Sequence, residues 1–409
     1  MVIIGSSKRE PLFNLSENSR EKMEISERMK QIAPSMTLAI DAKAKKLQAE
    51  GVDVLSFGAG EPDFNTPAPI CEAAKKGIDA GHHKYTPVPG TLELRKAICH
   101  YLSQQYKVQY EPGDIVVSGG AKHSLYNAFL ALVNPGDEVL IPSPYWVSYP
   151  EQVKFAGGVP VFVECSEKDE FKLTPEALKA KITPKTKVLI LNSPSNPTGA
   201  VVGRKAMEGI AELVVKHKIW VISDEIYAKL IYGEEHVCFP SLSKEVAAQT
   251  ILVNGMSKAY AMTGWRLGYA AGPSKVMKAI GDFQSHSTSN ATAIVQDAGV
   301  AALAMPDSEI QKMVEVFKKR RDMIVDGLNA IPGIKCLKPA GAFYVFPNVK
   351  GLFKPGRSNS MELSDFLLDK AKVALTPGIA FGAEGFMRMS YATSEKIIQE
   401  GLKRIKEAV

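Results

Sequence analysis

Residues Thr250 to Gly272 read TILVNGMSKAYAMTGWRLGYAAG, and this stretch is the clearest guide to the fold. Its apolar opening predicts a short buried strand, and Asn254-Gly255 predicts a turn at the end of that strand. Lys258 follows the turn, and Arg266 comes eight positions later. A lysine at the end of a buried strand can lose its preference for the charged form through desolvation, although most lysines are exposed. The stretch alone therefore fits a surface lysine and a nucleophilic amine equally well.

The composition is that of an ordinary soluble globular enzyme. The chain has 409 residues, of which 45% are hydrophobic and 23% are charged, and its formal net charge is +6. This length predicts two or three domains. The densest basic run, Lys318 to Arg321, continues a helical pattern without interleaved aromatic residues, which favours a solvated helix face over a nucleic-acid site.

The cysteines and histidines show no metal-ligand spacing, so no metal site is predicted. The five cysteines are scattered and odd in number, which favours a reducing compartment. No apolar run approaches the roughly 20 residues of a membrane span, and the N-terminus lacks a secretory core segment. We therefore expect a cytoplasmic protein that binds neither nucleic acid nor a membrane.

Apolar runs alternate with helical patterns through the middle of the chain. Such runs, bounded by helices, predict an α/β fold with a largely parallel sheet that is buried on both faces. The strands predicted for this sheet comprise residues 115–117, 139–141, 159–163, 187–191, 219–223 and 251–253.

A different region follows Met305. A long amphipathic helix is predicted over 309–328, with strands over 341–346 and 387–391 and helices over 362–371 and 395–409. This pattern predicts a smaller α+β domain that the N-terminal segment completes. The predicted boundaries are an N-terminal arm over 1–25, a large domain over 61–305, and a small domain that combines 26–60 with 306–409.

Four predicted strand ends carry groups suited to chemistry, and ligands of such sheets gather at the carboxyl ends of the strands. A glycine-rich turn that opens a helix can bind a phosphate, and Arg266 can add a charge-assisted bond to it. Asp224 can hold a pyridine nitrogen protonated, and Lys258 can supply an imine nitrogen. The four groups are Gly120-Ala121-Lys122, Asn196, Asp224 with Tyr227, and Lys258 with Arg266.

Together these groups describe a site for pyridoxal 5′-phosphate, in which Asn196 and Tyr227 donate hydrogen bonds to the phenolic oxygen. Each group has a structural alternative. Asn196 opens an Asn-Pro-Thr-Gly sequence that makes a good turn by itself, and an aspartate after a strand is commonly a helix cap. The conjunction of all four groups, each after an apolar strand, favours the cofactor site.

The chain at this point resembles the class I aminotransferases of fold type I, and more narrowly the bacterial-type aspartate aminotransferases, a branch that includes prephenate aminotransferases. The resemblance covers nearly all of the chain from about Ser26. It implies a mostly parallel seven-stranded sheet sandwiched by helices, plus a smaller α+β domain. The matching stretches are AGEPDFNTP, GGAKHSLYNAFLAL, PSPYWVSYPE, NSPSNPTGAV, SDEIYAKLIY, VNGMSKAYAMTGWRLGY, GAFYVF and MRMSYATS.

The resemblance implies that Lys258, Asp224 and Tyr227 are the catalytic residues. Lys258 would bind the cofactor covalently and later move the proton between the substrate's α carbon and the cofactor's C4′ atom. Asp224 would pair with the pyridinium nitrogen, and Asn196 and Tyr227 would contact the ring oxygen. Trp146 would stack on the ring face. The phosphate would be surrounded by Gly120, Ala121, Lys122 and Arg266, together with Tyr85 from the partner subunit.

The resemblance also implies a substrate site. Arg388 would bind the α-carboxylate through two parallel hydrogen bonds, a geometry that suits guanidinium. Lys122 and Thr37 match the positions that meet the distal carboxylate in the bacterial-type branch. The implied substrate-binding residues are Gly60, Thr37, Lys122, Trp146, Asn196 and Arg388.

One departure from the animal-type relatives is informative. Those relatives have a serine three residues before the cofactor-binding lysine, and here that position is Gly255, as in the bacterial-type branch. Ser257, next to the lysine, is then predicted to be structural rather than a phosphate ligand.

The resemblance implies reversible amino transfer between L-aspartate and 2-oxoglutarate, giving oxaloacetate and L-glutamate by a ping-pong mechanism in a homodimer with shared active sites. Amination of prephenate to arogenate is one alternative, because Thr37 and Lys122 also occur in relatives that use prephenate. Transfer between another amino acid and 2-oxo acid is a second alternative. A carbon–sulfur lyase or decarboxylase of the same fold type stays open. A non-enzymatic regulator built on an aminotransferase-like domain is not favoured, because it would need a DNA-binding domain before the matching region. A nucleotide-binding protein is not favoured either, because Gly58-x-Gly60 lacks the third glycine of a nucleotide fingerprint.

Overall fold

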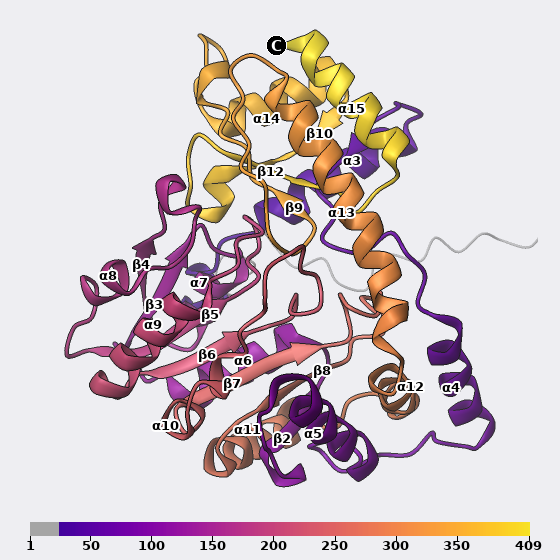
Figure 1. Cartoon of the computed structure of the whole chain (residues 1–409), viewed down its shortest axis with the longest axis vertical. Coiled ribbons are helices and arrows are strands. Elements are labelled where there is room, and N and C mark those ends of the chain that lie inside the picture. Colours follow the sequence, from indigo (N-terminus) through magenta and orange to yellow (C-terminus); the bar gives the residue numbers. More distant parts are fainter. Residues whose placement is uncertain (1–23) are drawn as a thin grey trace, which may run out of the picture. The chain divides into compact units, whose positions relative to one another are not determined.

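The computed structural model describes residues 24–409 (Figure 1). The chain divides into two compact units after Ala33. The described part of the first unit contains only the short helix α2 (Glu27–Lys30). Residues 1–23 of the predicted arm lie outside the described residues. The second unit, Pro34–Val409, contains all the predicted site residues and is described below.

The centre of this second unit is a seven-stranded sheet in the order β2-β8-β7-β6-β5-β3-β4. All neighbouring strands are parallel except β8, which runs antiparallel to both β7 and β2. This confirms the predicted mostly parallel sheet. Its strands are β2 (Ile115–Ser118), β3 (Glu138–Ser143), β4 (Val159–Glu164), β5 (Thr186–Asn192), β6 (Trp220–Asp224), β7 (Thr250–Gly255) and β8 (Gly268–Ala271).

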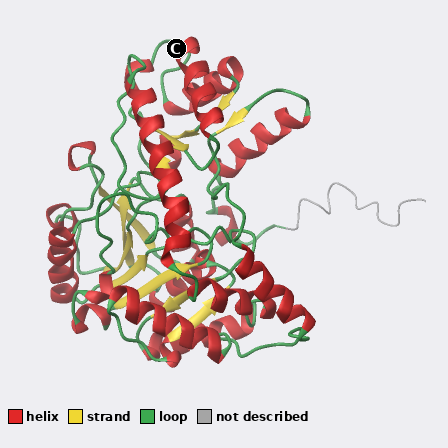
Figure 2. Ribbon diagram, turned by 45° about the vertical axis from the view of Figure 1, so that its right-hand side comes forward, coloured by secondary structure: helices red, strands yellow, loops and turns green. Residues whose placement is uncertain are grey.

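Helices cover both faces of the sheet, as Figure 2 shows. Successive strand residues point to opposite faces, so Ile222 packs into one hydrophobic cluster while Val221 packs into another. Both clusters are buried, which is why the strands read as continuous apolar runs. The helices are α4 (Ala68–Asp79), α5 (Leu92–Tyr106), α6 (Ala121–Leu132), α7 (Ser148–Phe155), α8 (Pro175–Lys179), α9 (Arg204–His217), α10 (Lys244–Ala247), α11 (Ser274–Ser287) and α12 (Ala293–Leu303).

Two small sheets belong to the α+β region. β11 (Thr376–Pro377), β12 (Met387–Ser390) and β9 (Tyr344–Val345) form an antiparallel sheet, and β1 (Leu55–Ser56) pairs in parallel with β10 (Val373–Ala374). The helices here are α3 (Met36–Ala49), α13 (Asp307–Asn329), α14 (Ser360–Ala371) and α15 (Glu395–Ala408). The predicted boundaries at 60/61 and 305/306 stay a prediction, because residues 34–409 form one compact unit.

Strand β9 is much shorter than the predicted strand 341–346. The N–H groups of Gly341 and Ala342 donate instead to the carbonyls of Gly199 and Leu230, which belong to loops of the central sheet. The segment therefore connects the small sheet to the large one.

Short 3₁₀ helices complete the second unit: η1 (Pro112–Asp114), η2 (Glu167–Asp169), η3 (Phe239–Ser241), η4 (Lys350–Leu352) and η5 (Gly378–Phe381). None of the helices in residues 24–409 is both long enough and apolar enough to cross a membrane.

Candidate active site

The loops at the carboxyl ends of the central strands, with β12 and α3, line a cavity of about 610 Å³. Of the predicted site residues, Gly120 and Tyr85 are outside the lining. The others all contribute to it: Thr37, Gly60, Ala121, Lys122, Trp146, Asn196, Asp224, Tyr227, Lys258, Arg266 and Arg388.

Lys258 lies just beyond β7 and points its amine into this cavity. The amine donates a hydrogen bond to the carbonyl oxygen of Gly60, and its Nζ atom lies 5.8 Å from the ring centre of Tyr227 and 5.7 Å from that of Phe343. Burial lowers the pKa of the amine to about 8, with Glu61 opposing this effect and Arg388 adding to it. The structure therefore favours an amine whose pKa is lowered by burial over an ordinary surface lysine.

Asp224 is the last residue of β6, and its carboxylate is almost fully buried. Oδ2 accepts a hydrogen bond from the Tyr149 hydroxyl at 2.7 Å, and Oδ1 accepts one from the Ile226 N–H at 3.2 Å. Burial raises the pKa of this carboxyl to about 6, although both hydrogen bonds favour the charged form. Since both donors are neutral, a cationic ring nitrogen would add the missing counter-charge.

Arg388 lies on β12 and brings a buried cation into the lining of the same cavity. Its Nη1 donates to Asn196 Oδ1 at 3.0 Å and its Nη2 to the Gly58 carbonyl at 2.8 Å, while the guanidinium covers the Tyr344 ring at 4.6 Å. Both acceptors are neutral, and within residues 24–409 the Nε atom has no hydrogen-bond partner. A buried guanidinium with neutral partners is suited to an anionic ligand.

Tyr227 is held by the same network. Its hydroxyl lies 3.0 Å from the hydroxyl of Tyr344, and the two rings pack edge to face. A Cβ atom at Gly60 would come within 3.3 Å of the Tyr344 hydroxyl, so this loop passes close to the pair. Tyr227 and Asn196 are therefore members of one hydrogen-bonded and packed group with Arg388 and Tyr344.

The turn before α6 forms the other end of the cavity. Gly120 adopts φ +90°, and a Cβ atom there would lie 2.7 Å from Arg266 Nη2. A Cβ atom at Gly268 on β8 would lie 2.2 Å from the backbone nitrogen of Ala121. Glycine at both positions keeps the start of α6 open and next to Arg266, whose Nη1 donates to the Thr263 carbonyl at 3.0 Å. A helix start beside a guanidinium is suited to a phosphate.

The glycines at 119 and 120 predict a loop over 118–122 and a helix from His123, but helix α6 begins two residues earlier, at Ala121. Lys122 is therefore in the first helical turn, not in the loop. Its amine lies 4.8 Å from the centre of the Trp146 ring, and burial, with Arg266 nearby, lowers its pKa. Thr37, at the start of α3, lines the same cavity and shares a 2.9 Å hydrogen bond with Ser35.

Tyr85 is not part of this cluster. Its side chain is 90% exposed on the loop between α4 and α5. The expectation that it reaches the site of a second subunit stays a prediction.

Four residues of the site were not predicted from the sequence. Tyr149 binds Asp224, Tyr344 binds Tyr227, Glu61 accepts from Thr263 at 2.8 Å, and Asn192 donates to the Asp224 carbonyl at 2.9 Å. The signal that could have found Tyr149 is its position in PSPYWVSYPE, three residues after Trp146.

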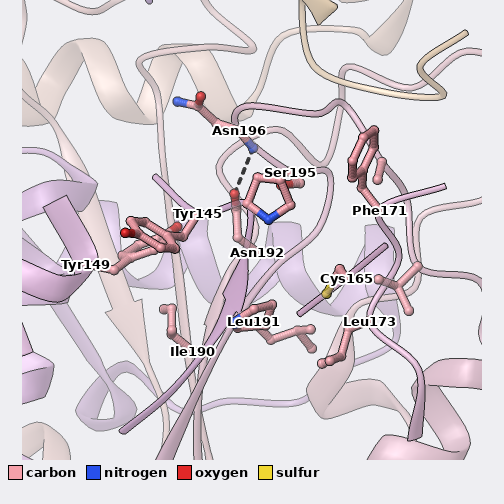
Figure 3. Close-up of a pocket in the computed structure, with 14 residues that line it drawn as sticks. Tyr145, Tyr149, Cys165, Phe171, Leu173, Ile190, Leu191, Asn192, Ser195 and Asn196 are labelled. Carbon is pink, nitrogen blue, oxygen red and sulfur yellow. Dashed lines mark hydrogen bonds between the residues drawn. The ribbon is translucent and has the colours of Figure 1, made fainter. Parts of the chain in front are cut away.

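A second cavity lies beside the first and shares Tyr149, Asn192 and Asn196 with it (Figure 3). Asn192 Oδ1 accepts a hydrogen bond from the backbone N–H of Asn196 at 2.9 Å, drawn as the dashed line in Figure 3. The bond fixes the loop that carries Asn196. Much of the remaining lining is apolar, including Leu173 and Leu191.

Within residues 24–409, no group of three or more His, Cys, Asp or Glu side chains is arranged to hold a metal ion.

Comparison with known proteins identifies the family. The family model of class I and II aminotransferases matches residues 52–405, and the chain belongs to this family. It is 49% identical to the aspartate aminotransferase of Geobacillus stearothermophilus over 94% of this chain and 98% of that protein. It is 48% identical to a probable aspartate/prephenate aminotransferase of Aquifex aeolicus, over 94% of this chain and 98% of that protein.

A solved structure extends the likeness to the fold. The aspartate aminotransferase of Thermus thermophilus with maleate superposes with a TM-score of 0.90 at 41% identity, covering 95% of this chain and 100% of that one. These findings confirm the predicted family and fold class.

Proposed function

We propose that this aminotransferase uses pyridoxal 5′-phosphate to transfer the amino group of L-aspartate to 2-oxoglutarate, giving oxaloacetate and L-glutamate in a ping-pong reaction. The observation that carries the proposal is the placement of the Lys258 amine in one cavity with Arg266 at the phosphate-like end and Arg388 on β12. The names of the similar aspartate aminotransferases support the choice of substrates.

The residues present fit this cofactor. Because Gly120 and Gly268 lack a Cβ atom, Arg266 and the start of α6 can lie close together, an arrangement suited to an anion. Asp224 offers a buried carboxylate with neutral partners, which suits a protonated ring nitrogen. When bound, pyridoxal phosphate supplies an electron sink and a carbonyl carbon that accepts and returns an amino group.

Each protein group then has a defined task. Arg266 and the N–H groups at the start of α6 would bind the phosphate, and Asp224 would hold the proton on the ring nitrogen. Asn196 and Tyr227 would donate hydrogen bonds to the ring oxygen, and Trp146 would cover the ring face.

Lys258 moves the proton of the substrate. Because burial lowers its pKa to about 8, more of its amine is neutral near physiological pH than in an exposed lysine, and the neutral amine can take the proton from the α carbon. Arg388 binds the α-carboxylate with Asn196 and the Gly60 backbone, so that the α C–H bond faces this amine. Proton transfer depends on this orientation, because the proton of a misplaced α carbon cannot reach the Lys258 amine.

Selectivity for dicarboxylates would come from two polar side chains of the cavity lining, Lys122 and Thr37. In this proposal Lys122 and Thr37, which line the cavity with Arg388, would bind the distal carboxylate. The similar Thermus structure was solved with maleate, itself a dicarboxylate, which agrees with this proposal.

Prephenate is a second candidate substrate. The similar Aquifex protein is named a probable aspartate/prephenate aminotransferase, and prephenate also carries two carboxylates. Lys122 and Thr37 would meet its second carboxylate at the same place.

The proposed assembly is a homodimer with shared sites, because the exposed Tyr85 is free to reach a phosphate in another subunit. Other proposed partners are amino acids and 2-oxo acids. A cytoplasmic location is also proposed, in line with five free cysteines.

The test begins with the visible absorption spectrum of the purified protein incubated with pyridoxal phosphate. We expect a visible band that is lost in Lys258→Ala. Initial rates with 2-oxoglutarate and aspartate, and with glutamate and prephenate, then rank the substrates. A colourless wild type would refute the cofactor, and strong activity limited to an aromatic or aliphatic pair would refute the aspartate assignment. Ammonia or thiol release would show elimination instead of transfer.

A further inference from the structure

Two fully buried glutamines lie behind the phosphate end of the cavity, Gln284 on α11 and Gln296 on α12. An amide buried without partners is destabilising, so the partners of these two show what the amides hold. The Gln284 oxygen accepts from Ser118 Oγ at 2.7 Å and from Asn127 Nδ2 at 3.1 Å. Its nitrogen donates to the carbonyls of Val88 at 3.0 Å and Val117 at 2.9 Å. The amide thus uses its full hydrogen-bonding capacity.

These bonds connect two segments with different tasks. Val117 and Ser118 end β2, immediately before the Gly119-Gly120 turn. Val88 belongs to the loop of residues 84–91, which carries Tyr85. Gln284 therefore joins the phosphate turn to this loop through one side chain.

Gln296 holds the same loop at two further points. Its oxygen accepts from the Thr91 N–H at 2.7 Å, and its nitrogen donates to Thr86 Oγ1 at 3.0 Å. Gly90 adopts φ +100°, and a Cβ atom there would lie 2.7 Å from Val117 Cγ2. The loop is thus packed directly on β2, and the Val117 N–H donates to the Pro89 carbonyl at 3.0 Å.

The loop presents apolar surface outward although it is fixed from within. Tyr85 is 90% exposed, and Ile78 of α4 and Leu92 of α5, which flank the loop, are 48% and 44% exposed. Tyrosine is enriched at protein interfaces relative to the rest of the surface. A second copy of this chain is the occupant that the proposed function requires.

We propose that Gln284 and Gln296 are positioning residues that couple phosphate binding at Gly119–Ala121 to association with a second copy of the chain through loop 84–91. The proposal rests on the proposed function, which places the phosphate at this turn and Tyr85 at the partner's site. A shift of the turn moves Ser118, and Gln284 passes this movement to Val88. Because such coupling is reciprocal, the cofactor strengthens association as much as association strengthens cofactor binding.

The test is sedimentation equilibrium of the full chain with and without pyridoxal phosphate, on wild type, Ser118→Ala, Thr86→Val and Gln284→Met. In wild type we expect the cofactor to tighten association by about tenfold, a typical coupling between two sites. Each variant should reduce this ratio to less than about threefold. Ser364→Ala is the matched control, since it removes another buried hydroxyl hydrogen bond, to the Leu375 carbonyl at 2.8 Å, away from this network.

The outcomes separate this proposal from the proposed function. A wild type without a cofactor band overturns the proposed function itself. A wild type that binds the cofactor but associates equally with and without it overturns the coupling alone. Variants that associate or bind more weakly but keep the wild-type ratio show a merely structural role, which also overturns it. If Gln284→Met does not fold, Ser118→Ala and Thr86→Val decide, because each removes a single hydroxyl.

Discussion

Two parts of the cavity are built in different ways, and we call them the phosphate end and the carboxylate end after the groups proposed to bind there. The phosphate end comes from the start of α6 and from the stretch between β7 and β8, where Gly120, Arg266 and Gly268 fit closely together. The carboxylate end depends on Arg388, which binds Asn196 from 192 positions away and Gly58 from 330 positions away. One end is shaped mainly by backbone with no room for side chains, and the other by side chains from distant parts of the chain.

Breaking the carboxylate end should give the largest effect. In Arg388→Met the substrate carboxylate loses its cation, and loss of one partner of a buried charged pair costs about 3 kcal/mol, or roughly a hundredfold in kcat/KM. Cofactor affinity should be little changed, because the phosphate end is intact. Steady-state kinetics and cofactor titration together measure both.

The matched control is Arg357→Met, which removes another buried arginine, one that packs on Phe366 instead of lining the cavity. Its kcat/KM should stay near the wild-type value. Equal losses in the two variants would mean that Arg388 acts only through stability.

Breaking the phosphate end should have the converse effect. In Gly268→Ala the new Cβ atom would meet the Ala121 nitrogen, and such overpacking against backbone costs about 1–3 kcal/mol. We expect cofactor affinity and thermal stability to fall while KM for aspartate changes little. Gly264→Ala is the control, since a Cβ atom there meets nothing within 4 Å. A normal cofactor affinity in Gly268→Ala would contradict this view of the cradle.

The buried amine of Lys258 should make the stability of the protein depend on pH. Its pKa in the folded protein is about 8, below the ordinary 10.5, so between these values the unfolded chain binds more protons. The stability of the cofactor-free protein, relative to Lys258→Met, should therefore rise with pH from about 8 to about 10, by at most about 2 kcal/mol.

Urea unfolding at several pH values measures this difference. The pair wild type and Gly264→Ala, which changes no titrating group, should give a difference that does not vary with pH. A pH-independent difference for Lys258→Met would show that the amine is not perturbed.

The smallest expected effect concerns the support of Asp224. Tyr149→Phe removes the 2.7 Å hydrogen bond to its carboxylate, worth about 1 kcal/mol, or roughly fivefold in cofactor affinity. The pKa of this carboxyl, already raised by burial, should rise further, so the loss should be greater at pH 6 than at pH 8.

Cofactor titration at both pH values gives the result. Tyr391→Phe, which loses a buried hydroxyl bonded to the Ala342 carbonyl at 3.2 Å, is the control and should show no such pH dependence. A loss that is the same at both pH values would assign Tyr149 a packing role only.

The comparison also explains what could be predicted from the sequence. The phosphate end, together with Asp224 and Lys258 beside it, was predicted from local features, namely apolar strands that are followed by glycines or by charged residues. Arg388 was predicted through the resemblance of MRMSYATS to a family, because nothing in its local sequence indicates a contact with Asn196.

What the sequence did not reveal depends on tertiary contact. Tyr149 and Tyr344 meet their partners only after distant segments pack, and no local period marks them. Strand β8 has just four residues, Gly-Tyr-Ala-Ala, too few large apolar side chains for recognition. The start of α6 was placed two residues late because glycines normally indicate a loop, whereas here Gly120 immediately precedes the helix.

The crowding at Gly255 carries a further consequence for protein engineering. A Cβ atom there would lie 2.8 Å from the Leu267 carbonyl, so β7 and β8 are too close for a hydroxyl to be added three residues before Lys258. Affinity for the phosphate therefore cannot be raised by grafting a side chain at that position. The adjustable part of the site is α3, where Asp41, Lys45 and Gln48 line the cavity from one helix. A redesign of substrate range that starts with α3 would leave the close-packed strand pair undisturbed.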